Sequence, residues 1–174
     1  MSFQIKAWVD GSAWNETGQG GWCAIVAALR DDITEEEVGE TITLASKALS
    51  DSRTDILVTE SAEDETLRYK MSILRGYAEN TTHNRMEMQA ILEAVRAMKH
   101  PCKMHIVSDS KVAMASLKNG KGKSNLDLVR DWQRESRRFS VSFEHIPGHS
   151  GHPIHEWCDK LASYKNGLTL EPQG

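Results

Sequence analysis

A nearly continuous run of apolar residues at 20–29 (GGWCAIVAAL) constrains the fold of this chain more than any other stretch. Such a run is typical of a β-strand that is buried on both of its faces. Residues 3–9 alternate apolar and polar side chains, and residues 66–78 have the β-rich composition of a third strand. The first part of the chain therefore predicts three strands, of which the opening ones resemble a hairpin.

The second part of the chain alternates helices with short strands. Residues 83–99 have the strongest helical pattern, with apolar side chains on adjoining stripes. The further helices that we expect are 111–118, 126–136 and 154–165. The further strands that we expect are 103–108 and 140–146. This order predicts an α/β domain with a mixed five-stranded sheet flanked by helices, because the later strands need crossover connections.

An acidic insertion at about 31–65 separates the second and third predicted strands. It holds twelve acidic residues against Lys47 and Arg53, so its net charge is −10. Thr34 followed by Glu37 predicts a helix that begins with a capping box. A short strand around 56–59 could also lie here, although the count of five strands leaves it out. We interpret the insertion as a partner-binding or substrate-excluding lobe.

Composition excludes several classes of protein. No run of 18 apolar residues is present, and the N-terminus lacks the apolar region of a secretory signal. The three cysteines are scattered and odd in number, which argues against a disulfide framework and favours a reducing compartment. We therefore expect a cytoplasmic monomer that forms one domain over residues 1–174 and has no membrane partner.

The net charge of −4 hides an uneven distribution. Residues 99–138 hold ten lysines and arginines against four acidic residues, a net charge of +6. A local positive face can bind phosphates whatever the total charge, because salt confines its field to about 8–10 Å. A solvated face without a ligand is the simpler interpretation of this pattern taken alone.

Two aspartates follow predicted strands. Asp10 ends the first strand in AWVDGS, and Asp109 ends the strand 103–108 in HIVSDS. If these strands are parallel neighbours, both carboxylates lie at the same end of the sheet, where α/β proteins usually bind ligands. The simpler explanations are a turn at Asp10 and a helix cap at Asp109–Ser110.

Glu87 is a more informative acidic residue. It lies on the apolar stripe of the helix 83–99, in line with Ile91 and Ala94. A carboxylate that faces the sheet is costly unless a charge neutralises it. The alternative is that Asn84 caps the helix and Glu87 completes a capping box, and both interpretations can hold together.

The segment HIPGHSGHPIHEWCD at 145–159 contains several histidines before Asp159. A zinc site would use the residues spaced three apart, namely His149, His152, His155 and Cys158. We disfavour zinc because successive steps of three turn the side chains to opposite sides of a helix, and because Pro153 marks the helix start. Asp159 instead falls one turn after His155, on the same face.

Four acidic residues on separate elements suit a hard divalent cation such as Mg²⁺, which takes oxygen ligands. Two such ions can activate a water and stabilise the leaving oxygen in phosphodiester cleavage. Five sequence blocks then occur in order, namely VDGSAWNETGQGGW, TTHNRMEMQAILEAV, IVSDS, SNLDLVRDW and IPGHSGHPIHEWCDKLA. With these blocks the chain resembles the type 1 ribonucleases H, which cleave the RNA strand of an RNA–DNA hybrid. The resemblance implies a ribonuclease H-like fold.

The same resemblance implies roles for individual residues. The metal-binding carboxylates would be Asp10, Glu87, Asp109 and Asp159. His149 would assist proton transfer or product departure. Two Mg²⁺ ions, or Mn²⁺ in their place, would promote in-line attack by water and leave 5′-phosphate and 3′-hydroxyl ends. The implied substrate contacts are Ser12 near the 2′-hydroxyls, Thr82 and Asn125 at DNA phosphates, and Asn84 in the minor groove.

The chain also departs from the family pattern. His83 stands where asparagine or glutamine is usual, and Glu16 stands where many members have asparagine. His155 stands where asparagine is common, beside Asp159, and could tune the pKa of Asp159 or simply pack there. A short loop at 118–124 replaces the long basic protrusion of some members. We therefore expect hybrid binding to be weaker and more salt-sensitive than in relatives that have the protrusion. The alternatives are a DNA nuclease of the same superfold and a catalytically silent nucleic-acid-binding module.

Overall fold

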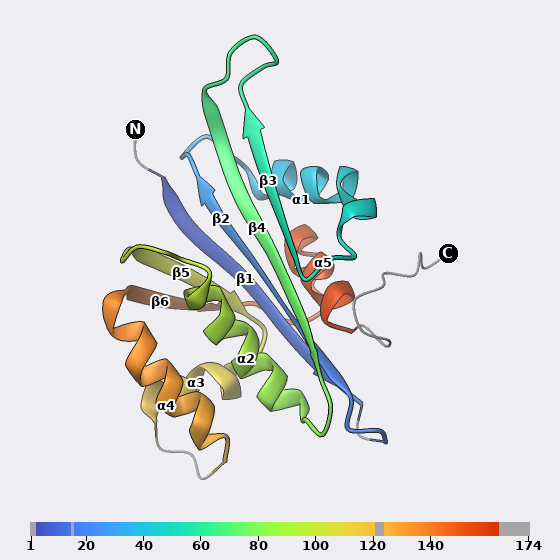
Figure 1. Ribbon diagram of the computed structural model, residues 1–174, viewed down its shortest axis with the longest axis vertical. Helices are drawn as coiled ribbons and strands as arrows, with labels where there is room; N and C mark the ends of the chain where they lie inside the picture. The colour runs from blue at the N-terminus through green and yellow to red at the C-terminus, as the bar shows by residue number, and fades with distance from the viewer. Residues whose placement is uncertain (1–2, 15, 121–123, 164–174) are drawn as a thin grey trace.

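The computed structural model describes residues 3–14, 16–120 and 124–163. Its centre is one mixed sheet in the order β3-β4-β2-β1-β5-β6 (Figure 1). The strands are β1 (Gln4–Ala13), β2 (Gly20–Leu29), β3 (Arg53–Thr59), β4 (Leu67–Ala78), β5 (Lys103–Ser108) and β6 (Ser140–His145). The pairs β1–β2, β2–β4 and β3–β4 are antiparallel. β5 runs parallel to β1, and β6 runs parallel to β5.

The prediction of five strands was wrong by one. Within the described residues the sheet has six strands, because residues 53–59 form β3 and pair with β4 at the edge of the sheet. The short strand considered around 56–59 is therefore present, and it begins three residues earlier. No residue of β3 is fully buried, since exposed and half-buried positions alternate along it. An edge strand of this kind lacks the apolar run that revealed β2, so its signal in the sequence is weak.

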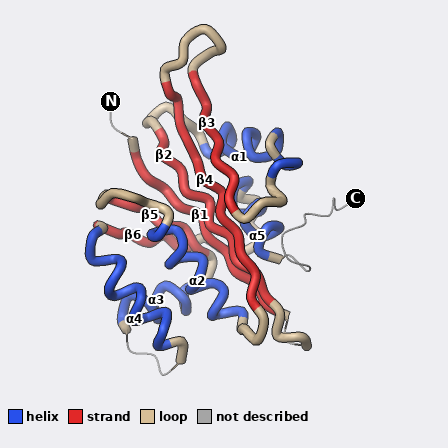
Figure 2. The backbone as a smooth tube through the Cα atoms, viewed as in Figure 1, coloured by secondary structure: helices blue, strands red, loops and turns tan. Residues whose placement is uncertain are grey.

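Helices cover both faces of the sheet. They are α1 (Glu35–Leu44), α2 (His83–Arg96), α3 (Lys111–Asn119), α4 (Leu126–Glu135) and α5 (Pro153–Ala162). Short 3₁₀ turns follow at Ser46–Ala48 and Ser136–Arg138. Figures 1 and 2 show α2, α3 and α4 on one face and α1 and α5 on the other. None of the described helices is both long enough and apolar enough to cross a bilayer.

The alternation of β1 and β2 divides the core into two clusters. Ala7 and Val9 point toward α2, α3 and α4, while Trp8 and Ile25 point toward α1 and α5. β2 lies between β1 and β4, and all its residues except Trp22 are buried. The expectation of a strand buried on both faces is therefore confirmed.

The helix predicted at 83–99 ends earlier, at Arg96. Pro101 follows closely, and the residue before a proline disfavours the helical conformation. The helix expected at 154–165 begins one residue earlier, at Pro153, and its predicted last two residues lie outside the described part of the chain. The other helices lie within one residue of their expected bounds.

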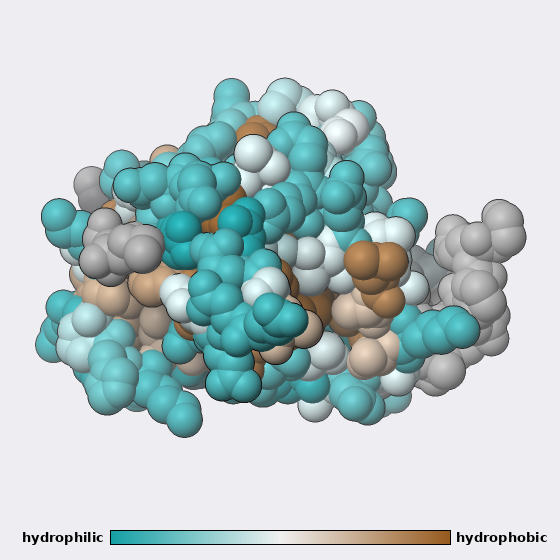
Figure 3. Space-filling view, turned by 90° about the horizontal axis from the view of Figure 1, so that it is seen from above, coloured by the Kyte–Doolittle hydropathy of each residue, from teal (hydrophilic) through white to brown (hydrophobic). Residues whose placement is uncertain are grey.

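The acidic insertion is integrated into the fold. Its helix α1 begins at Thr34, whose hydroxyl accepts a hydrogen bond from the Glu37 N–H, so the predicted cap is confirmed. Val38 and Ile42 of α1 are buried in the same cluster as residues of α5. Seen from above, the molecule is mostly hydrophilic, with hydrophobic side chains gathered in small groups (Figure 3).

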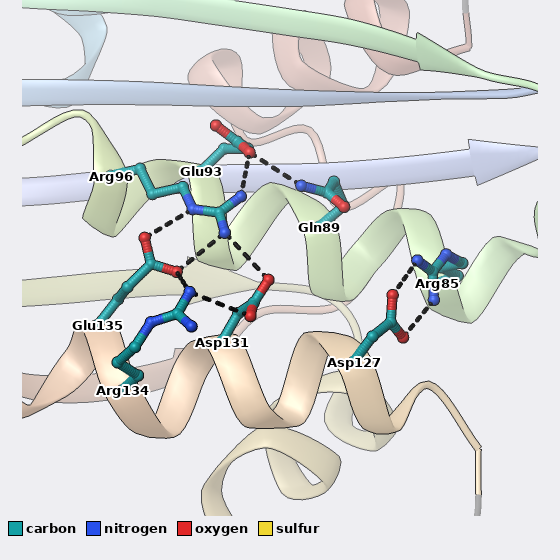
Figure 4. Close-up of polar contacts among 8 residues, drawn as sticks. All are labelled: Arg85, Gln89, Glu93, Arg96, Asp127, Asp131, Arg134 and Glu135. Atoms are coloured by element: carbon teal, nitrogen blue, oxygen red, sulfur yellow. Dashed lines mark hydrogen bonds and ion pairs between the residues drawn. The ribbon is translucent and has the colours of Figure 1, made fainter.

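Ion pairs connect α2 to α4 (Figure 4). Arg96 donates hydrogen bonds to Glu135 at 2.8 and 2.9 Å and to Asp131 at 3.2 Å. Arg85, near the start of α2, pairs with Asp127 through both of its terminal nitrogens. Three of the four acidic residues in 99–138 are thus paired with arginines of α2.

Candidate active site

The parallel pairing of β1 and β5 brings Asp10 and Asp109 together. The strands pair from Ile5 with Met104 to Trp8 with Val107, and each aspartate lies two positions further along its own strand direction. The predicted location at one end of the sheet is confirmed. Asp10 does not end its strand, however, because β1 continues to Ala13 and pairs there with β2. The turn proposed at Asp10 was therefore wrong, whereas Ser110 does cap α3.

Gly11 allows α2 to approach β1 closely. A Cβ atom at this position would lie 2.2 Å from the Met86 carbonyl carbon and 2.3 Å from the Glu87 nitrogen. The Gly11 N–H donates to Asp10 Oδ1 at 2.9 Å and to Glu87 Oε1 at 3.2 Å. One backbone amide thus lies between the two carboxylates.

Glu87 faces the sheet, as its place on the apolar stripe predicted, and is 1% exposed. The alternative that Asn84 caps α2 was wrong. The cap is Thr82, whose hydroxyl accepts a hydrogen bond from the Arg85 N–H at 3.2 Å. Thr82 lies outside the helix while Asn84 is already in its first turn, so only Thr82 can accept that bond.

The buried carboxylates hold protons more tightly than ordinary ones. Burial raises the pKa of Asp10, and the hydrogen bond with Glu87 and nearby negative charges raise it further. Burial also raises the pKa of Glu87, with the charge of Asp109 adding to the effect. The charge of Asp159 raises the pKa of both groups, so all four carboxylates interact. A cation at this site would relieve that repulsion.

The α5 end of the site is more open. The Asp159 side chain is 38% exposed, and the His149 Nδ1 atom lies 3.9 Å from its Oδ2 atom. His149 itself is exposed and has a φ of 54°, in a loop where a Cβ on Gly148 would lie 3.0 Å from Asp109 Oδ2. The absence of a side chain at Gly148 lets this loop pass close to Asp109.

His155 lies deeper, among the carboxylates. Its Nε2 atom is 3.8 Å from Asp10 Oδ2 and 3.8 Å from Asp109 Oδ2. Burial lowers the pKa of His155, although Asp109 and Asp159 oppose this effect. The neutral imidazole is therefore favoured. The sequence analysis placed His155 beside Asp159 only, so its closeness to Asp10 and Asp109 was not expected.

The rejection of a zinc site agrees with the geometry. The Cys158 thiol is buried and donates to the Trp8 carbonyl at 3.0 Å. Burial raises the pKa of Cys158 well above its usual value, which disfavours the thiolate that zinc needs. His152 caps α5 and pairs with Glu35 of α1. His152 and Cys158 therefore have partners elsewhere.

The residues expected to contact substrate lie on β1, at the start of α2 and at the start of α4. Thr82 is exposed at the start of α2, and Asn125 lies at the start of α4, where its Oδ1 accepts from Arg85 at 3.3 Å. The half-buried Asn84 has an Oδ1 atom with no hydrogen-bond partner in the described part of the chain. Ser12 lines a small surface pocket beside Trp14. Arg85, which links two of these positions, was missed from the sequence although it lies in the NRMEM block.

The donor set suits a divalent cation. Glu87 Oε2 and His155 Nε2 are both buried and lack a hydrogen-bond partner among the residues that the structure describes. One ligand atom each from Asp10, Asp109 and His155 lies within 4.8 Å of the others. Buried polar atoms without partners are costly, and a bound cation would satisfy them.

Known proteins share this architecture. The ribonuclease H of Campylobacter jejuni (serotype O:23/36, strain 81-176) is 28% identical, covering 91% of this chain and 88% of its own length. The ribonuclease H of Nitratidesulfovibrio vulgaris (strain DP4) is 30% identical, covering 98% and 96%. The crystal structure of LC9-RNase H1, a type 1 RNase H with the type 2 active-site motif, superimposes with a TM-score of 0.63 at 19% identity, covering 93% of this chain and 71% of that one.

The fold is therefore ribonuclease H-like, as expected. The sequence model of the RNase H family matches residues 56–166, a range that includes Glu87, Asp109 and Asp159. Asp10 precedes this range, but the match to the relative from Nitratidesulfovibrio vulgaris extends over nearly the whole chain. The chain belongs to the RNase H family.

Proposed function

We propose that this protein is an endonuclease that hydrolyses the RNA strand of RNA–DNA hybrids and leaves 5′-phosphate and 3′-hydroxyl ends. Membership of the RNase H family supports the reaction class. The observation that carries the finer proposal is the buried, mutually repelling carboxylate cluster, in which Glu87 Oε2 has no partner among the described residues. Such a cluster is unstable by itself and favours cation binding.

The proposed metal ligands are Asp10, Glu87, Asp109 and Asp159. Two Mg²⁺ ions, or Mn²⁺ in their place, would supply an activated water and charge stabilisation of the leaving oxygen. The exposure of the four carboxylates rises from Glu87 at 1% to Asp159 at 38%. The cluster thus opens toward α5, and we expect the scissile phosphate to enter from that side.

The protein's own groups would orient the substrate and move protons. His149 is exposed and lies 3.9 Å from Asp159, and we expect its imidazole to take or give a proton as the product leaves. Thr82 and Asn125 lie at the starts of α2 and α4, where helix dipoles favour phosphate. Ser12 and Asn84 would contact the minor groove, where 2′-hydroxyls distinguish RNA from DNA.

The insertion is proposed to bind a partner or exclude some substrates. A groove of about 720 Å³ lies between α1 and α5 and is lined by Glu36, Glu40 and Leu44, among others. Replacing Glu36 and Glu40 by glutamine would strengthen hybrid binding if the lobe repels nucleic acid. Unchanged binding in a titration of labelled hybrid would contradict the exclusion role.

One substrate panel tests the proposed activity against its alternatives. Labelled RNA–DNA hybrid, RNA duplex and DNA duplex of one sequence are incubated with the protein and Mg²⁺, or with EDTA. Mg²⁺-dependent cleavage of the hybrid's RNA strand, with 5′-phosphate ends by mass spectrometry, supports the proposal. Cleavage of the DNA duplex favours the DNA nuclease, whereas binding to the hybrid without cleavage favours the silent module.

A further inference from the structure

We propose that His155 is a direct metal ligand, and that Asp10, Asp109 and His155 form a mixed nitrogen–oxygen site that favours Mn²⁺ over Mg²⁺. This inference rests on the proposed function, because it concerns the cation site of the same cluster. The three side chains come from separate parts of the fold. Asp10 lies in β1, Asp109 follows the end of β5, and His155 lies in α5.

The spacing of the three side chains fits shared ligation. His155 Nε2 lies 3.8 Å from an oxygen of Asp10 and 3.8 Å from an oxygen of Asp109, which is too far for a hydrogen bond to either. Two atoms that each lie about 2.0–2.2 Å from one cation are separated by about 3–4 Å. The observed separations fall in that range.

The burial of the ring points the same way. The His155 side chain is 4% exposed, and its Nε2 atom has no hydrogen-bond partner in the described ranges. A buried ring nitrogen without a partner is costly. Because two carboxylate oxygens lie 3.8 Å from this nitrogen, a single cation bound among the three atoms would satisfy it.

The start of α5 fixes the direction of His155. The His152 ring caps the helix by accepting a hydrogen bond from the His155 N–H at 3.2 Å. Pro153 occupies the first helical position, and Ile154 is fully buried. One turn later, Cys158 is fixed by its bond to the Trp8 carbonyl of β1. These contacts hold the imidazole against the end of the sheet, so its position is built into the fold.

An imidazole ligand changes cation preference. Mg²⁺ prefers oxygen ligands and releases its waters reluctantly. Imidazole suits transition cations, and Mn²⁺ also accepts carboxylates. A site with two carboxylates and one imidazole is therefore expected to hold Mn²⁺ more tightly than a site in which an amide oxygen takes the place of the imidazole.

The test uses Mn²⁺ itself as the probe on the full chain. Pulsed electron paramagnetic resonance detects a nitrogen atom that is bound directly to Mn²⁺, and titrations with Mg²⁺ competition give both affinities. The variants are His155→Asn and two matched controls, His149→Asn and His83→Asn. The controls remove the other histidines near the carboxylates, since His83 Nε2 lies 3.4 Å from Glu87 Oε1.

We expect nitrogen coupling in the wild-type protein and in both controls, and its loss in His155→Asn. The same variant should weaken Mn²⁺ binding by about 10-fold or more, and Mg²⁺ binding by less than about threefold. A wild-type spectrum without nitrogen coupling overturns the inference, and that spectrum decides even if His155→Asn fails to fold. Coupling that persists in His155→Asn overturns it as well.

Failure of this inference differs from failure of the proposed function. A protein that cleaves the hybrid with Mg²⁺ but shows no nitrogen coupling contradicts only the role of His155. A protein that binds Mn²⁺ through nitrogen but leaves the hybrid intact contradicts only the nuclease activity.

Discussion

At the scale of single residues, the site buries two acidic side chains next to each other. Asp10 and Glu87 are 3% and 1% exposed, and the Gly11 amide donates to both of them. The sequence predicted these two acidic residues because one follows a strand and the other lies on an apolar stripe. The place of His155 could not be predicted, because it depends on how α5 packs against the end of β1.

Replacing Asp10 by asparagine should separate activity from stability. We expect hybrid cleavage to fall by more than about 100-fold, since a direct cation ligand is lost. The metal-free protein should become more stable by about 1 kcal/mol, or ~2–4 °C in melting temperature, because the cost of burying an acidic group beside Glu87 is removed. Hybrid cleavage assays and thermal unfolding in EDTA measure the two effects. Unaltered cleavage would contradict the catalytic assignment.

The raised pKa values predict how stability depends on pH. Asp10 and Glu87 hold protons more tightly in the folded than in the unfolded protein, where their pKa values are about 4. Above that pH, the folded state binds more protons than the unfolded state, so this contribution to the free energy of unfolding falls as pH rises.

Melting curves of the metal-free wild-type protein and of Asp10→Asn, recorded from about pH 5 to 9, check this sign. The wild-type protein should lose stability relative to the variant as pH rises, and Mg²⁺ should restore more of it at high pH than at low pH. A stability difference between the wild-type protein and Asp10→Asn that stays constant with pH would contradict the raised pKa of Asp10.

At the scale of helices and strands, the acidic insertion joins the core. Its helix α1 packs Ile42 into the cluster that also holds Ile154 and Leu161 of α5. The sequence predicted this helix from its cap, but it could not show where the helix packs, because charge dominates its composition. Deleting the insertion would therefore expose the core around α5, which carries His155 and Asp159.

Two substitutions on α1 test this packing as a matched pair. Ile42→Ala should cost about 2–5 kcal/mol in the free energy of unfolding, because Ile42 is fully buried. Leu44→Ala should cost less than about 0.5 kcal/mol, because Leu44 is 89% exposed on the same helix. Urea denaturation measures both values. Equal costs would show that α1 is not anchored in the core.

At the scale of the whole molecule, two segments of the chain carry opposite net charge. The insertion is strongly acidic, whereas residues 99–138 are basic. Three of the four acidic residues in 99–138 also pair with arginines of α2, which offsets their negative charge. The element order and the central strands followed from hydropathy patterns. The sixth strand was only considered around 56–59 and was left out of the count, because β3 is an edge strand whose side chains are at most half-buried.

This charge distribution predicts salt-sensitive substrate binding. Hybrid affinity should fall by at least about tenfold between 50 and 200 mM salt, since phosphate contacts release counterions. The exposed Lys118 at the end of α3 should contribute, so Lys118→Gln should reduce the slope of log affinity against log salt by about 1. Lys47→Gln, in the acidic insertion, is the matched control and should leave the slope unchanged. Affinity that does not change with salt would contradict the basic face as the binding surface.

We propose that the clustered carboxylates perform Mg²⁺-dependent cleavage of the hybrid. The most direct measurement is the initial rate of RNA-strand cleavage by Asp109→Asn, compared with the wild-type protein and with Asp51→Asn. Asp51 is exposed in the insertion and provides the same change of charge outside the site. We expect Asp109→Asn to lose more than about 100-fold in rate while Asp51→Asn keeps the wild-type rate. Equal rates for all three proteins would contradict it.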